Sequence, residues 1–125
     1  MEDFTMLYTL GYQKRTAEEF YGIIAAHNIG HVLDVRSKPN GRRPEFNPKR
    51  MAAEVPKYTW LGKTCGGFGV VTDQAIADLA ETIRASESAG ENTVLVCFER
   101  DHTECHRYYD LARRLEPLGI TAHHL

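Results

Sequence analysis

Short apolar stretches alternate with amphipathic ones along the chain. The apolar stretches are rich in β-branched and aromatic residues, which favours strands, and we expect them at 6–10, 31–35, 57–61, 93–97 and 120–125. The amphipathic stretches repeat apolar residues every three or four positions, the period of a helix with one buried face. These predict helices at 17–27, at 48–55, from 73 to the turn at Gly90, and from about 104 onward.

Capping signals mark several of the expected helix ends. Residues 16–19, TAEE, form a capping box, and Thr72 is a good first residue for the long helix. Asn47 before Pro48 is typical of an N-cap followed by a first-turn proline. Asn28 is expected to end the first helix.

The alternation of strands and helices predicts one α/β domain. Because crossovers between parallel strands are right-handed, the chain should form a mainly parallel sheet of about five strands with helices on both faces, a Rossmann-like three-layer fold. Its 125 residues suit a single domain. The strand at 93–97 is the expected centre, with Val94, Leu95 and Val96 buried. The sequence leaves the strand order open. Residues 62–69, glycine-rich around Cys65, are expected to form a flexible loop.

Polar and charged side chains follow three of these strands at the point where each strand ends. Tyr12, Arg36 and Glu99 occupy these positions. The carboxyl ends of parallel strands meet at one edge of a sheet, where ligands bind in open α/β folds. We therefore expect these three side chains to share one rim.

Charge is distributed unevenly. The net charge is −2, yet segment 36–50 holds six basic residues and one acidic residue, a charge of +5, so the remainder carries −7. A basic loop on an acidic protein favours a defined anion site over a broad nucleic-acid face.

Four arginines are candidate anion ligands: Arg36, Arg42, Arg43 and Arg107. Arg107 begins the last expected helix, where backbone N–H groups and the helix dipole favour an anion. Arg36 and Arg107 are therefore expected to hold one anion between them. The alternative is that they form ion pairs, Arg36 with Asp34 and Arg107 with nearby carboxylates.

Glu99 is the candidate general acid or base, because a carboxylate near arginines can activate water or hold a substrate hydroxyl. His106 or Tyr12 would assist it. The alternative is that Glu99 orients Arg36 or Arg107, and the sequence does not separate the two roles.

Three cysteines, an odd and sparse set, favour reduced thiols over a disulfide framework. Cys105 lies near a helix start beside His106, where a nucleophilic thiolate would be stabilised. It also belongs to an apolar helical stripe with Leu111 and Leu115, and we favour this core role. A cysteine-phosphatase loop needs Arg six positions after Cys, and from Cys97 that position is Thr103.

A metal site could be drawn from Cys97, Cys105 and four histidines, which are His102, His106, His123 and His124. None of the familiar zinc spacings is met. In a regular helix, adjacent Cys105 and His106 project about 100° apart. The sequence therefore predicts no metal, and it contains no cofactor motif.

Composition argues against a membrane protein. Hydrophobic residues make up 42% and charged residues 26%, as in soluble globular proteins, and the apolar runs are too short to cross a bilayer. The N-terminus is acidic where a signal peptide would be basic. We expect a cytoplasmic protein.

Five segments occur in an order that resembles a known family: TLGYQKRTAEEF, VLDVRSKPNGRRPEFN, YTWLG, VLVCFERDHTECHR and the terminal HHL. They are similar to the domain of unknown function 488 family, which shows an Asp-Val-Arg before a basic loop, a Leu-Gly pair, a Cys-x-Glu and a Cys-His-Arg. The resemblance implies an α/β fold with a shared rim site and no settled activity. The chain departs from the family where Lys63 replaces a usual second glycine and the following stretch is short.

These observations predict a small enzyme that acts by hydrolysis or group transfer on a phosphate-bearing substrate, a nucleotide or a nucleic-acid end. One alternative is a non-catalytic module that binds a nucleotide or nucleic acid through the same groups. A second alternative is thiol chemistry at Cys105, of the rhodanese or phosphatase kind. Oligomeric state does not follow from the sequence.

Overall fold

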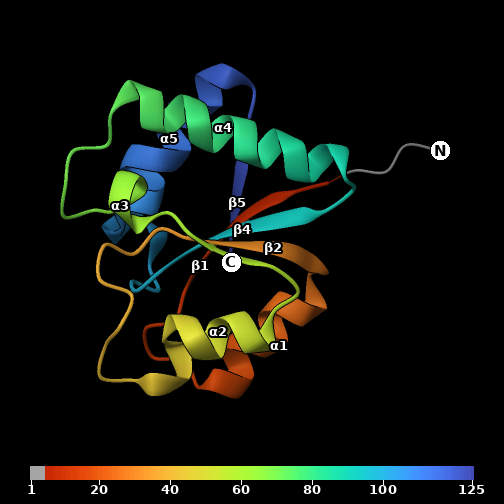
Figure 1. The fold of residues 1–125 in the computed structure, drawn as a ribbon, viewed down its shortest axis with the longest axis vertical. Coiled ribbons are helices and arrows are strands. Elements are labelled where there is room, and N and C mark those ends of the chain that lie inside the picture. The colour runs from red at the N-terminus through yellow and green to blue at the C-terminus, as the bar shows by residue number, and fades with distance from the viewer. Residues whose placement is uncertain (1–4) are drawn as a thin grey trace.

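The computed structural model describes residues 5–125, apart from the side chains of His102, Arg107 and Tyr108. The described chain forms one sheet of five parallel strands in the order β3-β2-β4-β1-β5 (Figure 1). The strands are β1 (Leu7–Gly11), β2 (Ile29–Asp34), β3 (Tyr58–Trp60), β4 (Asn92–Cys97) and β5 (Ala122–His124). The predicted parallel α/β fold is confirmed. The structure also gives the order of the strands, which the sequence did not determine.

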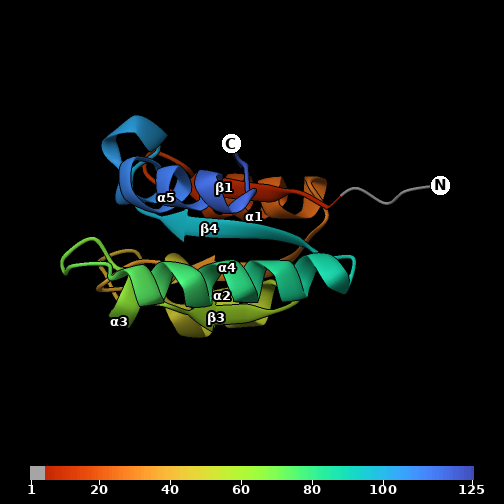
Figure 2. The ribbon, with the colours of Figure 1, turned by 90° about the horizontal axis from the view of Figure 1, so that it is seen from above.

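Helices cover both faces of the sheet. They are α1 (Ala17–Ala26), α2 (Pro48–Glu54), α3 (Gly62–Cys65), α4 (Asp73–Ser88) and α5 (Arg113–Leu115). In Figure 1, α1 and α2 lie below the sheet, and α3, α4 and α5 lie above it. Figure 2 shows α4 and α5 side by side along their face. The fold therefore has three layers.

Two apolar cores fill the spaces between the layers. Under α1 and α2, Phe20 and Met51 pack with Val94 and Val96. On the other face, Leu95 packs against α4 and the C-terminal helical segment. Val94, Leu95 and Val96 are each 0% exposed, which confirms β4 as a central strand buried on both faces.

Two of the four expected helix starts are confirmed by hydrogen bonds. Thr16 Oγ1 accepts from Glu19 N at 3.1 Å, and the Glu19 carboxylate accepts from Thr16 N at 2.8 Å. Thr72 Oγ1 caps α4 in the same manner. Asn47 precedes α2, but its side chain accepts from Gly41 N at 2.9 Å and so fixes the basic loop.

The segment after β4 differs from the continuous helix expected from residue 104. It consists of a 3-10 turn (His102–Glu104), a π-helix (Arg107–Ala112), α5 and a second 3-10 turn (Glu116–Leu118). Pro117 lacks an N–H group and cannot continue the helical bonding pattern. Gly119 then ends the segment with φ of 82°, a left-handed value that glycine tolerates.

No helix in the described part of the chain combines the length and apolar character needed to span a bilayer.

His31 on β2 makes a pH-dependent contribution to stability. Its ring is buried, with Nδ1 2.9 Å from Ser86 Oγ and Nε2 2.8 Å from Thr59 Oγ1. Burial, and then the charge of Lys57, lower the pKa of His31 from its usual 6.5. Because the unfolded chain takes up this proton more readily, the contribution is present above pH 6.5 and falls as the pH drops below it. Urea unfolding between pH 8 and pH 5 should show a smaller pH dependence in His31→Gln than in the wild type. An equal dependence in both proteins would contradict this assignment.

Candidate functional site

The carboxyl ends of β1, β2 and β4 border one cavity of about 200 Å³, called here the rim pocket. Four residues expected from the sequence line it: Tyr12, Arg36, Glu99 and His106. Lys38 lines it as well. The expected convergence of side chains that follow different strands is thus present in the structure.

Tyr12 and Glu99 are neighbours because the turns after β1 and β4 pack directly on each other. A Cβ atom on Gly11 would lie 1.8 Å from the carbonyl oxygen of Glu99, so the close approach needs glycine at this position. Gln13 N donates to the Phe98 carbonyl at 2.8 Å. The two turns therefore form a single edge of the rim pocket.

Arg36 is only 6% exposed and forms a bidentate ion pair with Asp34. Its Nε and Nη2 lie 2.8 and 2.7 Å from the two carboxylate oxygens. Burial opposes the charge on Arg36, but the hydrogen bonds and charge of Asp34 outweigh it and raise the guanidinium pKa. The guanidinium also lies over the Tyr12 ring, 5.3 Å from its centroid. Arg36 thus forms the ion pair with Asp34 that the sequence suggested as an alternative to anion binding, and it also lines the pocket.

Asp34 holds this part of the rim together. It accepts from Tyr58 Oη at 2.6 Å and from Arg36 N at 3.1 Å, in addition to the guanidinium. Burial and the hydrogen bond to Asp34 raise the pKa of Tyr58. The buried carboxylate therefore has a partner on β3 as well as on the loop after β2.

The remaining predicted arginines lie elsewhere. Arg43 stacks on Phe46, 4.4 Å from the ring centroid, and donates to the carbonyl groups of Tyr12 and Arg15. Arg42 is exposed. Neither residue is part of the pocket lining, and their anion-binding role stays a prediction. The side chain of Arg107 is outside the described residues, so its shared site with Arg36 also stays a prediction.

His106 connects three segments around the pocket. Its Nε2 lies 3.0 Å from the Val35 carbonyl oxygen and 2.9 Å from that of Cys65. Two acceptors at Nε2 assign the proton to this nitrogen. Nδ1 is then the acceptor nitrogen, and it lies 3.6 Å from Cys105 Sγ.

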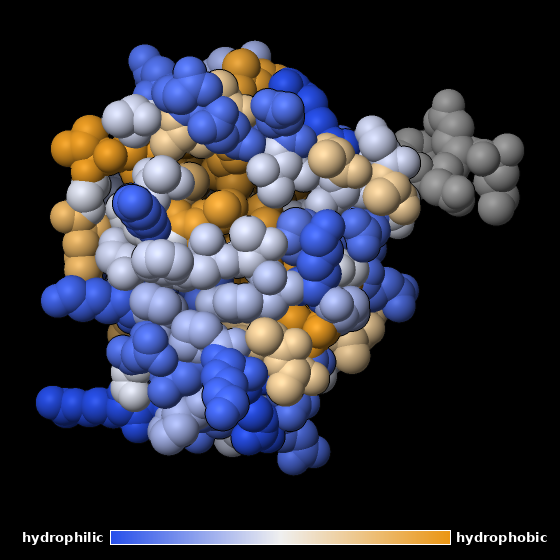
Figure 3. Space-filling view, in the orientation of Figure 1, coloured by the Kyte–Doolittle hydropathy of each residue, from blue (hydrophilic) through white to orange (hydrophobic). Residues whose placement is uncertain are grey.

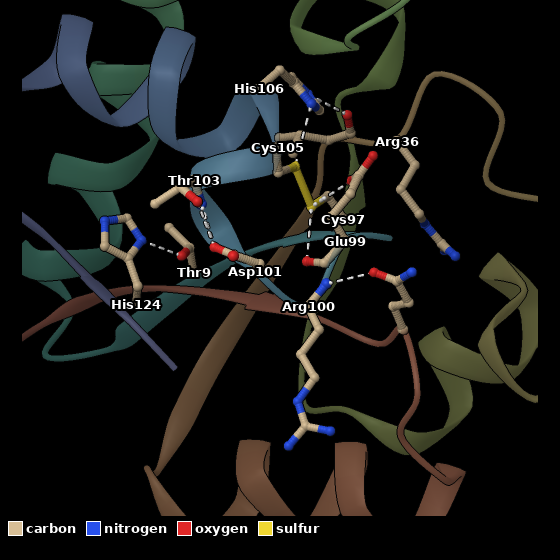
Figure 4. The surroundings of a disulfide bond; sticks show 12 residues. Thr9, Arg36, Cys97, Glu99, Arg100, Asp101, Thr103, Cys105, His106 and His124 are labelled. Carbon is tan, nitrogen blue, oxygen red and sulfur yellow. Dashed lines mark hydrogen bonds between the residues drawn. A yellow bond between two sulfur atoms is a disulfide. The ribbon is translucent and has the colours of Figure 1, made fainter.

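A disulfide joins Cys97, at the end of β4, to Cys105 beside His106 (Figure 4). The expectation of three reduced thiols is therefore wrong for this pair, because the fold brings together two cysteines whose sequence spacing gives no such sign. Both are nearly inaccessible, at 2% and 1% exposed, in agreement with the expected core role of Cys105. Cys65 is a free thiol, and burial raises its pKa.

The glycine-rich segment 62–69 is not simply a flexible loop. Residues 62–65 form α3, and a Cβ atom on Gly62 would lie 1.9 Å from the Arg36 carbonyl oxygen. Phe68 N donates to Ser37 Oγ at 3.0 Å. These glycines permit close packing against the loop after β2, and this packing brings Phe68 to the pocket.

Apolar surface gathers at the edge where the chain runs from α3 to α4 (Figure 3). Phe68 and Val70 in that segment are 80% and 90% exposed. Phe98 and Tyr109, also partly exposed, line the pocket with Phe68 and Tyr12, so four aromatic residues contribute to its lining. Lys38 Nζ lies 5.8 Å from the centroid of the Phe68 ring.

Gly66→Ala should destabilise the protein, because the new Cβ would lie 2.1 Å from Ser37 Oγ and 2.3 Å from the Gly62 carbonyl oxygen. We expect a loss of about 1–3 kcal/mol, typical of an overpacked site, in urea unfolding. Gly69→Ala is the matched control, since nothing lies within 4 Å of its Cβ position. Equal stability of the two variants would contradict the packing role of Gly66.

No protein-family model, no curated protein and no solved structure matches this chain. The resemblance to the domain of unknown function 488 family therefore stays a prediction from the sequence motifs, and the rim pocket is the feature from which a function can be inferred.

Proposed function

We propose that the rim pocket binds a phosphate-bearing ligand, either a nucleotide or a nucleic-acid end. The observation that supports this most is one cavity lined by Lys38 and Arg36 together with four aromatic residues, which are Tyr12, Phe68, Phe98 and Tyr109. Cations bind phosphate through charge-assisted hydrogen bonds, and aromatic rings stack on bases. The cavity of about 200 Å³ is smaller than typical ligand pockets, so it suits one part of a nucleotide, with the rest beyond its opening.

The proposal includes hydrolysis or group transfer, with Glu99 as the proton acceptor beside the bound phosphate. Glu99 is partly exposed and lines the same cavity as Tyr12 and His106. His106 has only Nδ1 available for proton transfer, since Nε2 bonds to two backbone carbonyl groups. Glu99 is therefore the leading candidate of the three.

A non-catalytic binding module is the second candidate. Two observations favour it: Arg36 forms an ion pair with Asp34, and backbone groups hold His106 in place. Both residues thus have structural roles that require no turnover. Thiol chemistry at Cys105 has less support, because its sulfur is buried and joined to Cys97.

The Glu99→Gln variant separates the two candidates. If the protein is an enzyme, the Glu99→Gln variant, prepared without metal ions, should bind a nucleoside monophosphate as the wild type does. Its turnover of nucleotide substrates should fall by about 10²–10⁴-fold. Glu18→Gln, at an exposed position of α1, is the control and should retain both properties. Binding without turnover in the wild type would support the module, and absence of binding would overturn the proposal.

Membership of the domain of unknown function 488 family and a cytoplasmic location are part of the same proposal. They are supported by the motif order and by the composition of the chain. Asp34, Arg36, Glu99 and His106 belong to the motifs behind the resemblance, and the last three line the rim pocket.

A further inference from the structure

Three side chains that can bind a metal ion meet beside the rim pocket, and two of them, Cys97 and Glu99, line it. Cys97 Sγ, a carboxylate oxygen of Glu99 and Cys105 Sγ all lie within 4.8 Å of one another (Figure 4). Glu99 Oε2 is 3.6 Å from Cys97 Sγ, and His106 Nδ1 is 3.6 Å from Cys105 Sγ. The two sulfur atoms and the carboxylate oxygen thus form one group, and His106 Nδ1 lies at its edge, against Cys105.

Two of the spacings agree with zinc coordination, whereas the two sulfur atoms are joined in the disulfide and must separate before an ion binds. Zinc binds sulfur at about 2.3 Å and nitrogen or oxygen at about 2.0–2.1 Å in a tetrahedral arrangement. This geometry puts a sulfur ligand about 3.5 Å from a nitrogen or oxygen ligand. Both distances of 3.6 Å match that value.

His106 has the environment of a metal-binding histidine. Such histidines almost always donate the second ring N–H to a carbonyl or carboxylate group, which fixes the tautomer. Here Nε2 is held by the carbonyl groups of Val35 and Cys65, and Nδ1 faces Cys105 Sγ. A side chain on Gly67 would begin 3.0 Å from Nδ1, and glycine keeps that space clear.

The two cysteines are spaced widely for a disulfide. Their Cα atoms are 7.5 Å apart, whereas disulfides usually span about 4.4–6.8 Å. Two thiolates that share an ion need no direct bond and tolerate the wider spacing. The disulfide and the metal site are therefore alternative states of one pair of cysteines.

We propose that the reduced protein binds one zinc ion through Cys97, Glu99 and Cys105, with His106 Nδ1 as the fourth ligand. Two thiolates favour zinc over magnesium or calcium, which prefer oxygen ligands. In the metal-bound protein Glu99 is a ligand, so the proton-acceptor role proposed above applies only to the metal-free protein.

Two features of the sequence count against a metal: none of the familiar zinc spacings is met, and adjacent residues of a regular helix, such as Cys105 and His106 were expected to be, project in different directions. In the structure these residues lie between the 3-10 turn His102–Glu104 and the π-helix Arg107–Ala112. The separation of about 100° for adjacent helical residues therefore does not apply. This irregular backbone allows the adjacent side chains to approach one ion.

The test uses the full chain, reduced with a phosphine and freed of metal. Calorimetric titration with zinc should give one ion per chain and a dissociation constant below about 1 µM. Cobalt(II) in place of zinc should give thiolate-to-cobalt charge-transfer absorption, which reports the sulfur ligands directly. The oxidised protein, with Cys97 and Cys105 joined, should show neither signal.

Variants identify the ligands. Serine at Cys97 or at Cys105 should weaken zinc binding by more than about 100-fold, since loss of an outer-shell partner alone costs 10–100-fold. Cys65→Ser is the matched control, because Cys65 is a buried thiol outside the cluster, and it should bind as the wild type does. Circular dichroism verifies that each variant folds.

Two results would overturn the proposal. One is the absence of zinc binding and of the cobalt charge-transfer band in reduced wild-type protein, a result that needs no variant. The other is wild-type zinc affinity in both Cys97→Ser and Cys105→Ser. Binding of a nucleoside monophosphate by the metal-free protein is a separate measurement. Its result tests the proposed function independently of zinc binding.

Discussion

Asp34→Ala is expected to lower the free energy of unfolding by about 3–5 kcal/mol, the cost of breaking a buried ion pair from one side. The variant leaves the Arg36 guanidinium, 6% exposed, without its bidentate acceptor. Tyr58 Oη also loses its acceptor at the carboxylate. Burial then disfavours the positive charge of the Arg36 guanidinium, which Asp34 stabilises in the wild type. Urea unfolding measures the difference.

Glu54→Ala is the control for this prediction. It removes an ion pair with Arg50 whose side chains are 38% and 53% exposed. Exposed pairs contribute only about 0–1 kcal/mol. If Asp34→Ala costs as little as Glu54→Ala, the buried network does not hold the rim together.

Lys38→Ala is expected to weaken nucleoside monophosphate binding by about 1.5–3 kcal/mol, the range for hydrogen bonds to a charged group. Lys38 is exposed and lines the rim pocket, so its removal should leave stability nearly unchanged. The loss should shrink at high salt, because salt screens exposed charges. Calorimetric titration at two salt concentrations provides the measurement.

Lys49→Ala is the matched control for charge. Lys49 is exposed on α2 and is not part of the pocket lining. Its removal lowers the net charge by the same amount as Lys38→Ala. Equal losses of affinity in the two variants would mean that phosphate responds to overall charge and not to a site at Lys38.

The elements of the fold followed from local patterns, and its long-range pairings did not. The apolar run at 93–97 marks a strand buried on both faces, and the capping signals at Thr16 and Thr72 mark real helix starts. Strand order depends on which neighbours pair across the sheet, and periodicity along the chain does not contain that information. The glycines of segment 62–69 indicated flexibility from composition alone, although they permit contacts with the distant residues Arg36 and Ser37.

Sequence patterns also predicted only the part of the site that follows from the ends of the strands. Tyr12, Arg36 and Glu99 follow strands whose carboxyl ends must share an edge, so topology alone groups them. The basic composition of the loop after β2 could have indicated Lys38 as a pocket residue. Nothing in the sequence indicated Phe68, because it reaches the pocket through the packing of the segment after α3 on Ser37. The pairing of Cys97 with Cys105 likewise depends on the irregular backbone after β4.

One phosphate-bearing ligand is expected to contact several strand ends at once. Titration of the metal-free protein with a nucleoside monophosphate, followed by amide chemical shifts, tests it directly. We expect shifts at residues 12–13, 36–38, 67–68 and 98–99 that follow a single binding curve. Absence of shifts, or shifts confined to exposed basic residues away from the pocket such as Lys49 and Arg50, would contradict it.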